Sequence, residues 1–227
     1  DKQIAIMSPE IDPFIAPVCH EQIEILYEDE HLLLINKPSG LLSLSGKHPA
    51  NKDSVHYRLV IDYPSALMVH RLDLGTSGIM VIALNKVINA QLCRQFSNRE
   101  VTKSYTALLD RHLVPNKGVI DAPIAKADFP LQKICYDSGK PAQSRYEVIE
   151  RLTQPFCSRV IFTPITGRTH QLRIHSQQLG HSILGCDLYG NEETRLKGKR
   201  LMLHATTLNF IHPVTLQEMN GQCVCPF

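Results

Sequence analysis

The chain has 227 residues, 43% of them hydrophobic and 20% charged, a composition typical of a folded globular protein with one large or two small domains. No apolar stretch approaches the ~20 residues that cross a bilayer, and the first residues lack the basic start and apolar stretch of a signal peptide. The seven cysteines are odd in number and scattered, which argues against a disulfide framework and predicts a cytoplasmic protein with reduced thiols. Although the net charge is only +2, residues 86–200 hold 18 Lys and Arg against 10 Asp and Glu, which suits a bound polyanion and equally an ordinary mixed surface.

Residues 1–20, with Pro9, Pro13 and Pro17, are expected to form an irregular lead-in. Apolar patterning then predicts strands at residues 23–27, 31–36, 78–84, 102–109, 143–150, 158–163 and 201–211. Helical spacing predicts helices at residues 54–63, 86–96 and 168–179. Because strands outnumber helices and do not alternate strictly with them, we predict an α+β fold. Helices would flank a mixed, largely antiparallel central sheet.

The sequence offers little that could hold a metal or a nucleotide cofactor. His170 and His175 are five apart, whereas two ligands on one helix face want a separation of four, and no C-x-x-C pair occurs. The turn at residues 75–78 lacks the G-x-S-x-G spacing of a hydrolase, and no Walker or Rossmann glycine pattern is present. We therefore expect neither a metal nor a cofactor.

A polar loop, H-R-L-D-L-G-T-S-G at residues 70–78, lies between two apolar segments that resemble strands. Loops mounted on rigid sheets often present catalytic groups, and Asp73 is the acidic residue of this one. The alternative is an ordinary turn in which Asp73 only accepts hydrogen bonds from nearby backbone N–H groups. The local sequence favours that alternative.

A second polar cluster, P-I-T-G-R-T-H-Q-L-R-I-H, occupies residues 164–175. If a helix begins near residue 169, then His170 and Arg173 share one face, with Gln177 one turn further on. Leu172 and Ile174 flank the arginine, which indicates that Arg173 is partly enclosed and needs an anionic partner. A solvated helix face is the alternative, but Asp73 is a candidate partner.

These segments resemble those of the RluA-type pseudouridine synthases. The resemblance rests on H-R-L-D-L-G-T-S-G (70–78), N-K-P-S-G (36–40), K-S-Y-T-A (103–107), P-I-T-G-R-T-H-Q-L-R-I-H (164–175) and L-M-L-H-A (201–205). They occur in the family's order and cover nearly the whole chain, from about residue 23 to 213. Residues 132–148 are closer still to the branch of that family with dual specificity for 23S ribosomal RNA and tRNA.

The resemblance implies roles for particular residues. It makes Asp73 the catalytic aspartate, Tyr105 the active-site tyrosine and Arg173 the arginine that pairs with the aspartate. It also implies contacts with the RNA by Arg71, His70, Arg168 and His170, of which Arg71 would help to fill the space left by a flipped base. The family commonly reads G-D-x-x-Y-G where this chain has Gly-Cys-Asp-Leu-Tyr-Gly at residues 185–190, so the resemblance assigns no role to Cys186 or Asp187.

The implied activity is the isomerisation of a uridine to pseudouridine in structured RNA, without a cofactor, in a central RNA-binding cleft. The target uridine would be flipped out of its stack, which favours a hairpin loop in 23S ribosomal RNA or tRNA. Residues 21–227 would form the catalytic domain, without an N-terminal S4-like module, in a monomer that contacts no membrane. Two other functions remain open: a non-catalytic RNA-binding protein, and a hydrolase, which would normally need a second carboxylate.

Overall fold

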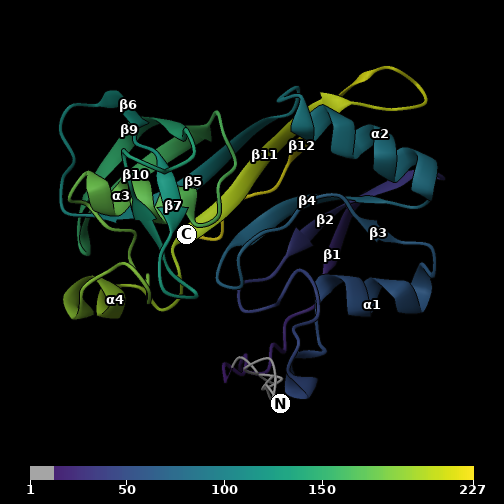
Figure 1. Cartoon of the computed structure of the whole chain (residues 1–227), viewed down its shortest axis with the longest axis horizontal. Coiled ribbons are helices and arrows are strands. Elements are labelled where there is room, and N and C mark those ends of the chain that lie inside the picture. Colours follow the sequence, from purple (N-terminus) through teal and green to yellow (C-terminus); the bar gives the residue numbers. More distant parts are fainter. Residues whose placement is uncertain (1–12) are drawn as a thin grey trace, which may run out of the picture.

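The computed structural model describes residues 13–227, in which a ten-stranded sheet joins two halves (Figure 1). The main path of the sheet runs through β1 (Glu24–Glu28), β2 (Leu32–Lys37), β4 (Ser77–Ala83), β11 (Leu203–Ile211), β5 (Thr102–Asp110), β10 (Phe156–Pro164), β9 (Gln143–Thr153) and β6 (Lys117–Asp121). Two further strands lie off this path, since β3 (Leu67–Met68) pairs with β4 and β12 (Glu218–Gln222) pairs with β11. A separate hairpin consists of β7 (Ile124–Lys126) and β8 (Gln132–Ile134).

The two halves meet where β4 lies beside β11, the one parallel pairing of strands within residues 13–227. Only two residue pairs are in register there, His204 with Ser77 and Ala205 with Gly78. Gly78 has a φ of +120°, and a Cβ on it would lie 2.1 Å from the carbonyl oxygen of Ala205. Any side chain would push the strands apart, so this glycine fixes the junction directly after the loop of residues 70–76.

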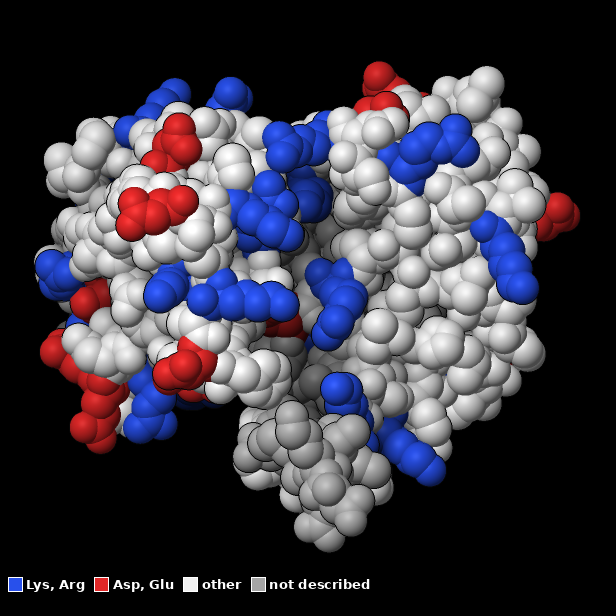
Figure 2. Space-filling view, in the orientation of Figure 1, with Lys and Arg blue, Asp and Glu red and all other residues white. Residues whose placement is uncertain are grey.

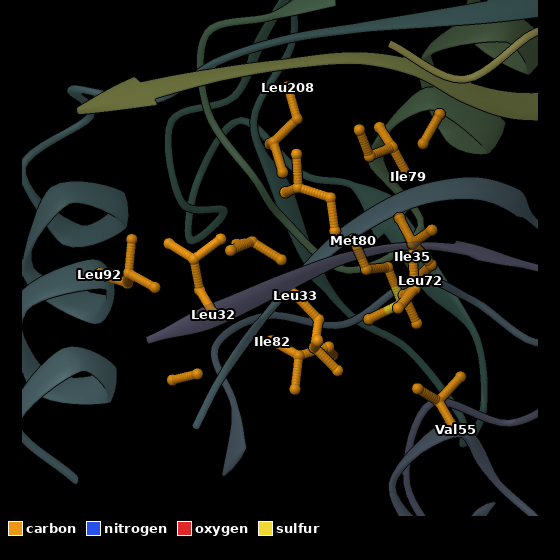
Figure 3. Packing of buried hydrophobic residues seen from close by; sticks show 14 of the residues in the cluster. Leu32, Leu33, Ile35, Val55, Leu72, Ile79, Met80, Ile82, Leu92 and Leu208 are labelled. Atoms are coloured by element: carbon orange, nitrogen blue, oxygen red, sulfur yellow. The ribbon is translucent and has the colours of Figure 1, made fainter. Parts of the chain in front are cut away.

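The first half encloses a hydrophobic cluster between the sheet and two helices, α1 (Val55–Asp62) and α2 (Lys86–Ser97). Every residue of β4 is buried, which explains why its sequence is a continuous apolar run. Figure 3 shows this cluster extending from Leu92 of α2, through Leu33 of β2 and Ile82 of β4, to Val55 of α1. The short 3-10 helix Pro49–Asn51 precedes α1.

The second half has its own cluster, built from β5, β9, β10 and α3 (Gln171–Gln178), with α4 (Glu192–Lys197) nearby in the chain. Leu172 and Ile174 of α3 are buried in it, as is Phe162 of β10. Tyr105 of β5 packs against the clusters of both halves. It therefore marks the boundary between them.

The predicted fold class is confirmed, and each predicted helix and strand is present within a few residues of its expected bounds. The helix predicted at residues 168–179 is wrong at its start, because His170 has a φ of 56° and the helix begins at Gln171. The apolar segment before the polar loop, which resembles a strand in the sequence, forms β3. The elements that the sequence did not predict are short or weakly patterned: β6, β7, β8, β12 and α4. Residues 13–23 contain no helix or strand, and the rest of the expected lead-in lies outside the described residues.

Candidate active site

The loop that carries Asp73 is held by the segment that follows β2. Ser43 Oγ donates to the carbonyl of Leu72 at 2.7 Å and accepts from its N–H at 3.0 Å. Ser39 Oγ donates to the carbonyl of Gly75 at 2.7 Å. Since Leu72 is also buried, the backbone on both sides of Asp73 is fixed. The N-K-P-S-G segment thus supports the H-R-L-D segment.

Lys37, the last residue of β2, is 0% exposed and ties these two segments together. Its Nζ donates to the carbonyl oxygens of Pro38, Leu41 and Leu74. Three acceptors saturate an ammonium group. Burial lowers the pKa of Lys37 to about 7, although nearby negative charges, Asp73 among them, oppose the shift. This lysine is therefore a buried support beneath the loop.

Arg173, on α3 in the second half, reaches Asp73 in the first. Its Nη1 lies 3.2 Å from Asp73 Oδ2, and the two side chains are 7% and 32% exposed. Burial works to lower the pKa of Arg173, but the charge of Asp73 raises it above its ordinary value. The arginine therefore stays charged, favours the ionised carboxylate and fixes its orientation. The two segments singled out in the sequence, 100 residues apart, meet here.

Tyr105 lies beside this pair. Burial raises the pKa of its hydroxyl, and the charge of Asp73 raises it further. The phenol is therefore neutral at physiological pH and close enough to Asp73 to respond to its charge. An enclosed, neutral aromatic ring suits stacking on a nucleobase, whereas a raised pKa makes it a poor general base.

His170 approaches Arg173 from the start of α3, and Tyr189 holds both. The Tyr189 hydroxyl accepts a hydrogen bond from the N–H of Gln132 at 3.0 Å and lies 2.6 Å from His170 Nδ1. Burial lowers the pKa of His170, so its ring is neutral. Nδ1 then accepts a hydrogen bond from the Tyr189 hydroxyl. The ring of Tyr189 faces the Arg173 guanidinium at 5.4 Å. Tyr189 therefore links the β7–β8 hairpin to the arginine of the site.

The other residues expected to contact RNA differ in their surroundings. His70 Nε2 accepts from the N–H of Val81 at 3.0 Å, and its ring stacks on Phe96 with centroids 4.6 Å apart. Burial lowers the pKa of His70 to about 3, so it is a neutral packing residue. Arg168 is half-buried and its Nε donates to a backbone carbonyl. Arg71 is exposed.

A hollow runs between the two halves of the molecule, with Lys and Arg side chains along its walls (Figure 2). Positive charge on both walls suits an RNA backbone. Among residues 13–227, no group of three His, Cys, Asp or Glu side chains could hold a metal ion. No helix in that part of the chain is long and apolar enough to cross a membrane.

Comparison with known proteins decides the family. Residues 31–178 match the family model described as RNA pseudouridylate synthase. The chain belongs to this family. The synthase is 48% identical to the dual-specificity RNA pseudouridine synthase RluA of Escherichia coli (strain K12) over 206 residues, which cover 89% of this chain and 93% of the relative. It is 45% identical to the protein of the same name from Haemophilus ducreyi, with 93% of each chain covered.

Solved structures agree with this assignment. The synthase superposes on the human RNA pseudouridylate synthase domain containing 1 with a TM-score of 0.79 and 30% identity, covering 93% of this chain and 86% of the other. The human RNA pseudouridylate synthase domain containing 4 gives a TM-score of 0.73 and 28% identity, with 89% and 88% covered. The synthase isomerises uridine to pseudouridine in RNA.

The structure shows where the acid of residues 185–190 lies, the segment in which this chain differs from the G-D-x-x-Y-G pattern of the resemblance. Asp187 Oδ1 is 3.0 Å from Arg173 Nη2. Cys186 is buried beside the guanidinium. Arg173 Nε is buried without a hydrogen-bond partner among the described residues. The sequence singled out this segment but not its contact with Arg173, because nothing in the motif locates the turn relative to α3.

Proposed function

We propose that the synthase modifies uridines in hairpin loops of 23S ribosomal RNA and of tRNA. Two observations support this choice: the relatives that match almost the whole chain are named dual-specificity enzymes, and residues 132–148 resemble the branch that acts on those two RNAs. Loops also cost least to open, because a flipped loop base gives up less pairing and stacking than one in a helix.

Asp73 is the proposed catalytic carboxylate, and its contact with Arg173 is the observation that carries the mechanism. In one route a carboxylate oxygen attacks C1′ of the ribose, the N1–C1′ bond breaks and the uracil leaves as an anion. The base turns, C5 bonds to C1′, and the bond to Asp73 breaks. In the other route Asp73 removes the C2′ proton of the ribose as the base detaches, and it returns that proton to C2′ when C5 bonds to C1′. In both, C5 finally loses its proton and N1 gains one.

The remaining residues position the base. Tyr105 stacks on the uracil while it is detached, and Arg173 keeps Asp73 ionised and oriented toward the ribose. Arg71, an exposed residue of the loop that carries Asp73, fills the space that the flipped base leaves in the RNA. His170 and Arg168 flank the same site from the loop that opens α3.

The proposal also covers the domain organisation, localisation, oligomeric state and cofactor requirement of the synthase. Residues 21–227 act as one catalytic domain. The synthase works as a cytoplasmic monomer without a metal or an organic cofactor, because the isomerisation involves no net oxidation and no external group.

The experiment maps pseudouridine in ribosomal and transfer RNA from cells with and without the gene, then supplies Asp73→Asn. We expect particular pseudouridines in both RNAs to be missing without the gene and to stay missing with the variant. The RNA affinity of the variant should match wild type. Sites confined to one RNA would contradict dual specificity. Normal turnover by Asp73→Asn would refute the mechanism, and release of free uracil would indicate a hydrolase instead.

A further inference from the structure

Lys103 is a half-buried residue at the start of β5, and among residues 13–227 its ammonium group has no ion pair or hydrogen bond. Its Nζ lies 5.9 Å from the centre of the Phe96 ring, in the first half of the molecule. The same atom would be 3.4 Å from a Cβ on Gly167, in the second half. Lys103 therefore places its ammonium between the two halves. Burial lowers its pKa, which reflects an enclosed charge that lacks a counterion.

Two other basic residues of the segment 86–200 are already engaged with the protein. Lys197 pairs with Asp110 at 2.7 Å and with Glu193 at 3.0 Å. Arg200 donates to two backbone carbonyls and to the Ser77 hydroxyl among its contacts. These charges stabilise the protein itself. Lys103 has its positive charge still available to an external anion.

The strand directs Lys103 to the same side as the catalytic tyrosine. Ser104 and Thr106 point to the opposite face of β5, where their hydroxyls meet Thr207 and Thr206 at 2.5 and 2.7 Å. Because side chains alternate along a strand, Lys103 shares the face of Tyr105, about 7 Å away along the backbone. An anion held by Lys103 would therefore belong to the nucleotide that stacks on Tyr105, or to its immediate neighbour.

We propose that Lys103 and the open space at Gly167 form a phosphate subsite that holds the RNA backbone beside the target uridine. The subsite rests on the proposed RNA-binding role of the hollow between the halves. A phosphate there would give Lys103 the counterion that the protein does not supply, and would anchor the strand while the base turns next to Asp73.

Gly167 contributes because it has no side chain. It is exposed, and its φ is not in the left-handed region, so another residue fits the backbone. A side chain there would fill the space around the ammonium without removing its charge. Gly167→Val therefore tests access to Lys103 separately from the charge of Lys103.

The experiment measures binding of a tRNA hairpin with a uridine in its loop, the class of substrate in the proposed function. A series of hairpins carries one neutral methylphosphonate each, next to a protecting 2′-O-methyl nucleotide, with matched hairpins that keep the phosphate charged. The variants are Lys103→Met, Lys103→Arg and Gly167→Val. Lys117→Met is the control, because Lys117 is an exposed lysine on the outer strand β6, 3.7 Å from Glu147.

We expect Lys103→Met and Gly167→Val to bind the charged hairpin roughly tenfold more weakly, while Lys103→Arg and Lys117→Met stay near wild type. One methylphosphonate near the target should weaken wild-type binding by a similar factor and have little further effect on Lys103→Met. If every methylphosphonate weakens Lys103→Met as much as wild type, the subsite is wrong. A wild-type protein that binds the hairpin but forms no pseudouridine would instead refute the proposed function and leave the binding comparison intact.

Discussion

Arg173 forms an ion pair with Asp187 in addition to its ion pair with Asp73. Nη2 of the arginine lies 3.0 Å from Asp187, while Nη1 lies 3.2 Å from Asp73. Asp187 is 73% exposed and Arg173 only 7%, so the arginine is held between the half-buried carboxylate of Asp73 and the exposed carboxylate of Asp187. Asp187 therefore restricts where Arg173 can point, and through it where Asp73 can point.

Removing the Asp187 carboxylate should lower kcat about fivefold while RNA affinity stays near wild type. Asp187→Ala leaves Arg173 held by Asp73 alone, and an ion pair with so exposed a partner contributes about 1 kcal/mol. Single-turnover rates with saturating enzyme isolate this effect from binding. An unchanged rate would show that Asp73 and the surrounding packing suffice to orient the arginine.

Moving the acid from position 187 to position 186 should restore the lost rate. Cys186 is buried against the guanidinium, whose Nε lacks a partner among the described residues, so the double variant Cys186→Asp/Asp187→Ala offers it a carboxylate. We expect this variant to regain most of the fivefold loss in the same single-turnover assay. A double variant as slow as Asp187→Ala would mean that position 186 cannot serve Arg173 here.

Tyr189→Phe should reduce kcat several-fold and leave KM and the fold unchanged. The variant keeps the ring over Arg173 but removes the hydroxyl shared by the N–H of Gln132 and by His170 Nδ1. Each group left unpaired costs about 1–2 kcal/mol locally. Amide exchange at Gln132 should accelerate, which reports the loosened hairpin directly. Slower turnover with unchanged exchange would separate the histidine contact from the hairpin contact.

Lys37→Met should lower kcat about tenfold or more while thermal stability changes little. The methionine leaves the carbonyls of Pro38 and Leu41 without this donor, and the carbonyl of Leu74, next to Asp73, keeps only the N–H of Gly40. It also removes a buried charge, and these effects oppose each other in stability. Turnover and thermal unfolding are measured on the same sample. Exposed Lys86, changed to methionine, is the matched control. A large loss of stability would make Lys37 a general structural residue instead.

Much of the fold could be predicted because its central strands and longer helices have clear apolar patterns. The wholly buried β4 is a continuous apolar run, and α2 shows helical spacing after a capping asparagine, Asn85. Strands such as β7 and β8 have only three residues each, too few for any periodicity to show. The start of α3 was misjudged because the left-handed φ of His170 depends on its tertiary contacts, and helix propensity does not register it.

The site was predictable only where motifs named its members. Local sequence favours a turn role for Asp73, and it predicts for Arg173 an enclosed cation with Asp73 as one candidate partner. Their contact depends on the parallel junction of β4 and β11 and on the packing of α3, which link segments 100 residues apart. The supporting roles of Lys37 and Tyr189 are set by backbone groups that they bind, and a sequence does not show which carbonyls or N–H groups will lie nearby.

Asp29 provides a test of pH-dependent stability away from the site. In the turn between β1 and β2 its carboxylate accepts from the N–H groups of His31 and Leu32, the Tyr27 hydroxyl and His212 Nε2, at 2.7–2.9 Å. Partial burial works to raise the pKa of Asp29, but these hydrogen bonds lower it from 3.8 to about 2. The stabilisation is therefore present above about pH 4 and is lost as the pH falls through about 2.

Asp29→Ala should lower the free energy of unfolding by about 2 kcal/mol at pH 7, the value that the lowered pKa implies. The difference from wild type should shrink as the pH falls from 4 toward 2, because the wild-type carboxylate becomes protonated and loses its advantage over the unfolded state. Urea denaturation of both proteins at pH 7, 4 and 2.5 measures this difference in the free energy of unfolding. Exposed Glu30, changed to alanine, is the neighbouring control and should give a small difference at each pH. A difference for Asp29→Ala that stays constant with pH would assign its effect to lost packing rather than to the ionised carboxylate.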